Sequence, residues 1–170
     1  NRAFVCNRDG YVYVFEEGKT ISKIFIGSPV YDINFSTDNK ELILATKKGV
    51  YKLELSNSIV TLMFPLYESL QSIFVDDKLV ITTSHGLYIV HENEVREVIP
   101  RTEFNKYGLT IFRELIYAGS IEGLFVIDKN LLLNDIANSF KSVQFSDTNI
   151  KNGWIIAILA VVLLIFVIIL

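Results

Sequence analysis

The chain has 170 residues and a formal net charge of −3, with 51% hydrophobic and 21% charged residues. This composition indicates one folded domain and excludes a disordered chain, because disorder requires low hydrophobicity and high net charge. The slight excess of acidic residues disfavours a nucleic-acid binder, and the single cysteine, Cys6, excludes both a disulfide framework and a cysteine-rich zinc site.

Glycine recurs along the chain at Gly10, Gly49, Gly86 and Gly123, with spacings of 39, 37 and 37 residues. Around each glycine the same pattern returns, as AFVCNRDGYVYVF, LILATKKGVYKLE, LVITTSHGLYIVH and IYAGSIEGLFVID. The residues two and four places after each glycine are apolar, which is the period of a strand with one constant buried face. The polar residue and glycine at the centre predict a tight β-hairpin in which glycine adopts a positive φ.

A further strand is predicted on either side of the hairpins. The preceding strands are 30–39, 70–77 and 108–113, and the following strands are 20–27, 58–64 and 94–100. About four strands in each repeat of 37–39 residues predict an all-β fold, a β-propeller of four-stranded antiparallel blades over residues 1–149.

The first repeat begins with its second strand and has no innermost strand of its own. The segment 142–149 (SVQFSDTN) is similar to the inner strand and turn 32–39 (DINFSTDN). We therefore expect the two ends of the chain to complete one blade of a compact four-bladed ring, which removes exposed strand edges. A larger propeller whose earlier blades precede Asn1 is the alternative.

The last part of the chain, residues 154–170, reads WIIAILAVVLLIFVIIL and contains no charge, Gly or Pro. At 1.5 Å per residue it would form a helix of roughly 26 Å, close to the thickness of the hydrocarbon core of a bilayer. We predict one transmembrane helix, with Lys151 and Trp154 at the membrane interface and 150–153 as a short linker. A buried core helix is the alternative, although such a helix normally keeps polar residues on its outer stripe.

Residues 2–149 resemble the repeats of quinoprotein-like, WD-repeat and bacterial extracytoplasmic sensor β-propellers. The stretch AFVCNRDGYVYVFEEGKTISKIFIGSPVYDINFS is similar to the quinoprotein-like repeat, and GVYKLEL, GLYIVHE and GLFVIDK are similar to the sensor repeats. The resemblance implies a propeller scaffold, which hosts many unrelated functions. The Trp-Asp ending of WD-repeats and the tryptophan-rich motifs of quinone enzymes are missing, since Trp154 is the only tryptophan, so we expect no redox cofactor.

The sequence contains no recognisable motif for catalysis, phosphate binding or metal binding. His85 occupies a turn position, His91 lies opposite the apolar face, and Cys6 falls in a column of small residues, so structural roles are expected for them. The hairpin loops instead predict a contact surface on one rim, because loops carry function on a rigid scaffold. The candidate rim contacts are Arg8, Lys47, Lys48, His85 and Glu122, and the candidate aromatic contacts are Tyr67, Phe104 and Tyr107.

Taken together, these features predict a membrane-anchored propeller that acts as a non-catalytic binding, sensing or scaffolding module without a cofactor or metal. The mixed charges of the rim favour a protein or peptide partner. The propeller is expected outside the cytoplasm, because the chain starts without Met, while Lys151 beside the apolar segment favours the cytoplasmic alternative. The other readings are a structural subunit of a membrane or cell-surface assembly and a quinoprotein-like propeller enzyme.

Overall fold

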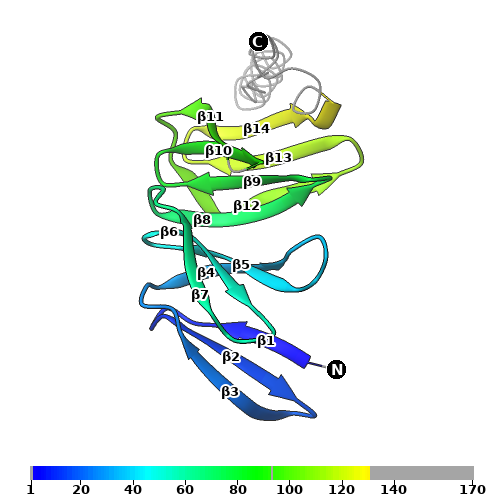
Figure 1. Ribbon diagram of the computed structural model, residues 1–170. Coiled ribbons are helices and arrows are strands. Elements are labelled where there is room, and N and C mark those ends of the chain that lie inside the picture. The colour runs from blue at the N-terminus through cyan, green and yellow to red at the C-terminus, as the bar shows by residue number, and fades with distance from the viewer. Residues whose placement is uncertain (1, 93, 131–170) are drawn as a thin grey trace, which may run out of the picture.

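The computed structural model describes residues 2–92 and 94–130, which form four antiparallel sheets in chain order (Figure 1). The first sheet contains β1 (Arg2–Cys6), β2 (Tyr11–Glu16) and β3 (Lys19–Phe25). The second contains β4 (Val30–Phe35), β5 (Glu41–Thr46), β6 (Gly49–Glu54) and β7 (Val60–Phe64). The third contains β8 (Ser69–Val75), β9 (Lys78–Thr83), β10 (Gly86–His91) and β11 (Glu94–Pro100). The fourth contains β12 (Phe104–Phe112), β13 (Leu115–Ser120) and β14 (Gly123–Asp128).

The sheets are stacked from the first, drawn in blue, to the fourth, drawn in yellow (Figure 1). The first strands of successive sheets lie side by side, since β4 contacts β8 and β8 contacts β12, while β1 contacts β4 from the first sheet. The predicted all-β architecture of antiparallel, propeller-like blades is confirmed, with three strands rather than four in the first and fourth sheets of the described chain.

Several predictions fall on residues outside the described ranges. They are the strand expected at 142–149, the linker 150–153 and the membrane helix 154–170 with Lys151 and Trp154. Within residues 2–92 and 94–130, no helix is long and apolar enough to cross a membrane.

The repeated glycine lies at the same hairpin of every sheet, but its structural role differs between sheets. A positive φ, as predicted, is found at three of the four positions: Gly10, Gly49 and Gly123. The prediction is wrong for Gly86, which has no positive φ and is needed for space. A Cβ atom at Gly86 would lie only 2.6 Å from the carbonyl oxygen of Ile99 on the neighbouring strand β11.

The predicted alternation of burial after each glycine is confirmed in β2 and β14 and is wrong for β6 and β10, where consecutive residues are buried. The residues two and four places after the glycine also do not all face the same neighbouring sheet. Tyr88, two residues after its glycine, packs on Ile43 of the preceding sheet. Val12, at the same place in the first repeat, packs on Leu42 of the following sheet. The first hairpin loop is longer, so Cys6 pairs with the residue two places after the glycine rather than one place after it. A shift of one residue turns every side chain to the other face, so Val12 and Val14 form the predicted buried face of β2 but turn it towards the following sheet.

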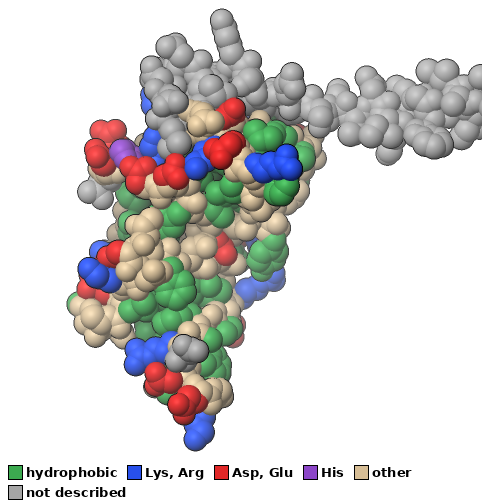
Figure 2. Space-filling view, turned by 90° about the vertical axis from the view of Figure 1, so that its right-hand side faces the viewer, with side chains coloured by type: hydrophobic (Ala, Val, Ile, Leu, Met, Phe, Trp, Pro, Cys, Tyr) green, Lys and Arg blue, Asp and Glu red, His purple; other side chains and the backbone are tan. Residues whose placement is uncertain are grey.

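The hydrophobic core lies between successive sheets, in three clusters of buried side chains. The largest fully buried residues are Leu42, Leu44, Leu53, Ile81, Leu87, Ile89 and Ile116. On the side of the stack shown in Figure 2, hydrophobic side chains are visible along the middle and charged side chains surround them. Burial of apolar side chains between the sheets stabilises the stack by about 25 cal/mol per Å² of apolar surface removed from water.

Polar side chains connect the inner strands at equivalent positions. Asp32 of β4 accepts the backbone N–H of Ser72 at 2.9 Å, and Gln71 of β8 accepts the backbone N–H of Leu109 at 2.8 Å. Both acceptors follow an irregularity in the pairing of their inner strand. We name these two contacts the inter-sheet clamps, because each fixes one sheet against the next.

Candidate functional site

Hairpin loops and the connections between sheets lie together on one rim of the stack. In three sheets a hairpin N–H donates to the connection that enters the same sheet: Lys47 to Pro29 at 3.1 Å, Ser84 to Glu68 at 3.0 Å and Ile121 to Glu103 at 3.1 Å. The same pair of loops therefore recurs in three consecutive sheets. We call the surface formed by the hairpin loops of the sheets and these connections the hairpin rim.

A hydroxyl group closes each of these three hairpins. The donors to the carbonyl oxygen of the repeated glycine are Thr46 at 2.8 Å, Thr83 at 3.0 Å and Ser120 at 3.1 Å. The hydroxyl oxygens of these three residues also accept backbone N–H groups of the loop, so each hydroxyl bonds to both sides of its turn. Sequence reasoning missed this feature, although a hydroxyl three residues before a repeated glycine is readable in the three repeats. Side chains on the hairpin rim are consequently carried by rigid turns.

The five predicted rim contacts all lie in the hairpin loops and are exposed. Arg8, Lys47 and Lys48 belong to the first two sheets and make no ion pair with any described residue. Glu122 belongs to the fourth sheet. The hairpin of the first sheet carries Arg8 beside the exposed carboxylate of Asp9, that of the second carries Lys47 and Lys48, and that of the fourth carries Glu122.

Of the three predicted aromatic contacts, two are exposed and one is buried. Tyr67 and Tyr107 are 57% and 72% exposed. Phe104 is 2% exposed and packs on Phe125 with ring centroids 5.5 Å apart, so its prediction as a contact residue is wrong. The physical reason is that β12 begins at Phe104, where its pairing with Ser120 directs the ring into the core.

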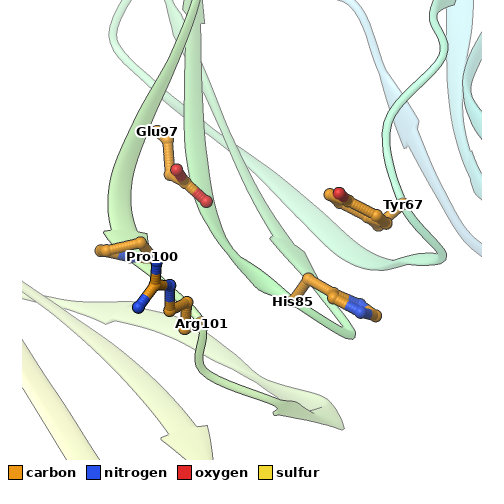
Figure 3. Close-up of a pocket in the computed structure, with 5 residues that line it drawn as sticks. All are labelled: Tyr67, His85, Glu97, Pro100 and Arg101. Carbon is orange, nitrogen blue, oxygen red and sulfur yellow. The ribbon is translucent and has the colours of Figure 1, made fainter.

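A pocket of about 450 Å³ opens on the hairpin rim and is lined by Tyr67, His85, Glu97, Pro100 and Arg101. The rings of Tyr67 and His85 are stacked, with centroids 4.3 Å apart and planes inclined by 13°. Figure 3 shows this pair on one side of the pocket and Glu97, Pro100 and Arg101 on the other. The volume falls within the range of small-ligand sites, and an aromatic wall faces two charged groups.

The charged side of the pocket is held in place by its neighbours. The hydroxyl of Tyr88 donates to Oε1 of Glu97 at 2.9 Å. Burial, and then this contact with Glu97, raise the pKa of Tyr88 to about 12. Arg101 has a φ of 56°, a backbone conformation that costs about 1–3 kcal/mol for a residue with a side chain and that often marks binding sites.

Thr102 locks this conformation from both directions. Its N–H donates to the carbonyl oxygen of His85 at 3.2 Å, and its hydroxyl donates to that of Pro100 at 3.3 Å. The two walls of the pocket are therefore tied together through one buried threonine.

A second group of polar residues joins three sheets on the same rim. Nζ of Lys106 lies 3.7 Å from Oε1 of Glu68 and 4.2 Å from the ring centroid of Tyr31. Burial, followed by the hydrogen bond and charge of Glu68, raises the pKa of Tyr31 to about 12. These three groups satisfy one another, which favours a structural role over ligand binding.

The remaining residues singled out from the sequence lie away from the pocket. Nε2 of His91 lies 2.8 Å from the carboxylate of Asp77, and this contact lowers the pKa of Asp77. Cys6 packs between the first and second sheets, where burial and then the charge of Asp32 raise the pKa of its thiol. Neither His91 nor Cys6 is brought to the hairpin rim.

No family model matches this chain, and no curated protein matches it by sequence. Solved structures do match. The computationally designed Ika4 protein aligns with a TM-score of 0.62 at 14% identity, over 75% of this chain and 85% of Ika4. The AfRom2 CNH domain aligns with a TM-score of 0.55 at 9% identity, over 76% of this chain and 47% of that domain.

A sensor protein provides a third match. The extracellular domain of the putative hybrid two-component system BT4673 from B. thetaiotaomicron aligns with a TM-score of 0.60 at 14% identity. The alignment covers 74% of this chain and 20% of that domain. At these identities the likeness concerns the fold alone, and the described chain has a β-propeller-like fold similar to that of designed propellers, a CNH domain and an extracellular sensor domain.

Proposed function

We propose that this protein is a non-catalytic binding module whose hairpin rim recognises a protein or peptide partner. The observation that carries the proposal is the pocket beside His85, where an exposed aromatic side chain faces two charged groups on an edge strand and the residue after it. Aromatic and arginine side chains are the residues that contribute most to contacts between proteins.

The charge distribution of the hairpin rim supports a polypeptide partner. Arg8, Lys47 and Lys48 stand on one part of the rim, and Glu103 and Glu122 stand on another. A polyanion would be repelled by the second group, whereas a polypeptide can present both signs of charge. Opposed charges across an interface contribute to partner specificity and to the rate of association.

Selection of displayed random peptides on the purified full chain in detergent tests this proposal. Binding of the selected peptides is expected to fall by about 10-fold or more in Tyr67→Ala, because truncation of a central aromatic contact costs about 2 kcal/mol. The matched control is Tyr107→Ala, since Tyr107 is another exposed tyrosine and does not line the pocket. The proposal fails if the selected peptides bind Tyr67→Ala as tightly as the unaltered chain.

We further propose that residues 154–170 anchor the module in a membrane, with the propeller outside the cytoplasm. The apolar sequence of this segment and Trp154 at its start support the anchor, whereas Lys151 favours the cytoplasmic alternative for the propeller. Protease added to intact cells is expected to cleave the propeller, while cleavage only after lysis would contradict the proposed side of the membrane.

A second candidate function is a structural subunit of a membrane or cell-surface assembly. The observation in its favour is the outer face of the first sheet, where Val5 and Phe25 are 50% and 63% exposed and Lys23 lies 3.9 Å from the ring centroid of Tyr11. Phe25→Glu is expected to release such a subunit from its assembly. An unchanged particle size in a mild detergent would leave the binding module as the sole candidate.

A further inference from the structure

The pocket beside His85 holds two opposite charges that are not neutralised by each other. The carboxylate of Glu97 accepts one hydrogen bond, from Tyr88, and a carboxylate has room for more. The guanidinium of Arg101 makes no hydrogen bond or ion pair with any described residue, although it lines the same pocket. Figure 3 shows both groups on the same side, across from the Tyr67 ring.

This arrangement discriminates between classes of ligand. A carboxylate or phosphate group would be attracted by Arg101 and repelled by Glu97. An amine would be attracted by Glu97 and repelled by Arg101. The backbone N–H and C=O of one residue in an extended chain point to the same side, so together they satisfy both residues: the N–H donates to the carboxylate and the carbonyl oxygen accepts from the guanidinium. Hydrogen bonds to charged groups are also stronger than those between neutral groups.

The remaining walls fit a chain rather than an isolated amide. The stacked rings of Tyr67 and His85 offer flat apolar surface on one side of the pocket, and the ring of Pro100 offers it on the other. A side chain adjacent to the bound backbone groups can lie against these rings, which contributes apolar burial without another polar group. At about 450 Å³ the pocket has space for a short peptide segment.

We infer that this pocket binds the backbone N–H and C=O of one residue in an extended peptide segment, with Glu97 accepting the N–H, Arg101 donating to the carbonyl oxygen, and the neighbouring side chain packing on Tyr67. This inference rests on the proposed binding function and specifies its chemistry. It assigns Glu97 and Arg101 as specificity-determining residues, neither of which was a candidate from the sequence.

The test uses peptides selected by display on the full chain in detergent, made again with each backbone amide replaced in turn by an ester. An ester lacks the N–H donor and has a weaker carbonyl acceptor. We expect one position at which the ester weakens binding by about 10-fold, as expected for loss of a hydrogen bond to a charged group. Glu97→Gln and Arg101→Gln are expected to weaken binding of the parent peptide similarly, and Glu97→Gln is expected to reduce the penalty at that position.

Matched controls are Glu94→Gln and Arg96→Gln, which make the same chemical changes on β11 outside the pocket. Glu97→Gln keeps an oxygen that can accept from Tyr88, so folding is expected to persist, and thermal unfolding of every variant checks it. If Tyr67→Ala weakens binding while both pocket variants and all ester peptides bind normally, the backbone contact is wrong and the proposed function stands. If Tyr67→Ala also binds normally, the proposed function itself is wrong.

Discussion

The inter-sheet clamp made by Gln71 offers a quantitative test of how the sheets are held together. Gln71→Met keeps the length of the side chain and removes the oxygen that accepts the N–H of Leu109 at 2.8 Å. Leu109 is 3% exposed, so its N–H has little access to water in the variant. An unsatisfied buried donor costs about 1–3 kcal/mol, and the added apolar surface of methionine offsets part of this cost. We expect a loss of about 1–2 kcal/mol of unfolding free energy.

Urea unfolding of the full chain in a mild detergent, followed by circular dichroism, measures this loss. Hydrogen exchange of the segment 104–112 is expected to become faster at the same time, because the clamp protects an amide of β12. Gln71→Glu retains an acceptor oxygen and is expected to lose less than half as much. An unchanged unfolding free energy in Gln71→Met, within about 0.5 kcal/mol, would refute a stabilising role for the clamp.

Three further predictions concern the core, a hairpin and pH. Leu53→Ala, at a fully buried position, is expected to lower the unfolding free energy by about 3–4 kcal/mol in urea unfolding. Gly86→Ala places a Cβ atom 2.6 Å from a backbone oxygen. It is expected to cost more stability than Gly18→Ala, where a Cβ atom meets open space and only the φ of 76° is unfavourable. Thermal unfolding of the two variants compares these losses. Burial and neighbouring glutamates raise the pKa of Tyr31 and Tyr88 from 10.0 to about 12, so the stability they contribute is complete below pH 10 and lost as the pH rises towards 12. Absorbance titration of the phenols should show the raised pKa of both tyrosines. The loss of stability at high pH should become smaller when both tyrosines are replaced by Phe.

The repeat in the sequence predicted the order of strands because a glycine at a fixed place in every hairpin reports a recurring backbone requirement. It did not predict that the first hairpin loop is longer, since the spacing from Cys6 to Gly10 equals that in the other repeats. Only the pairing of Cys6 with Val12 reveals the reversed face. The register of a hairpin is fixed by its turn type and loop length, and the spacing of apolar residues alone does not reveal the longer loop.

The candidate site was predicted in part for a similar reason. His85 and Tyr67 come from a hairpin and a connection, where the sequence marks turns and exposed aromatic residues. Glu97 and Arg101 come from an edge strand and the residue after it, with no motif to distinguish them from other surface charges. Phe104 was misplaced because the irregular pairing between Phe104 and Leu109 extends β12 beyond the strand predicted at 108–113.

Recognition at the pocket beside His85 is tested most directly by hydrogen exchange of the full chain with and without a selected peptide. Binding there is expected to slow exchange in the hairpin 84–86 and in the connection 101–103, where the N–H of Thr102 bonds to His85. The turns 36–40 and 76–77 join the other ends of strands and should exchange at unchanged rates. Protection confined to those two turns, with none at 84–86 or 101–103, would contradict recognition by the hairpin rim.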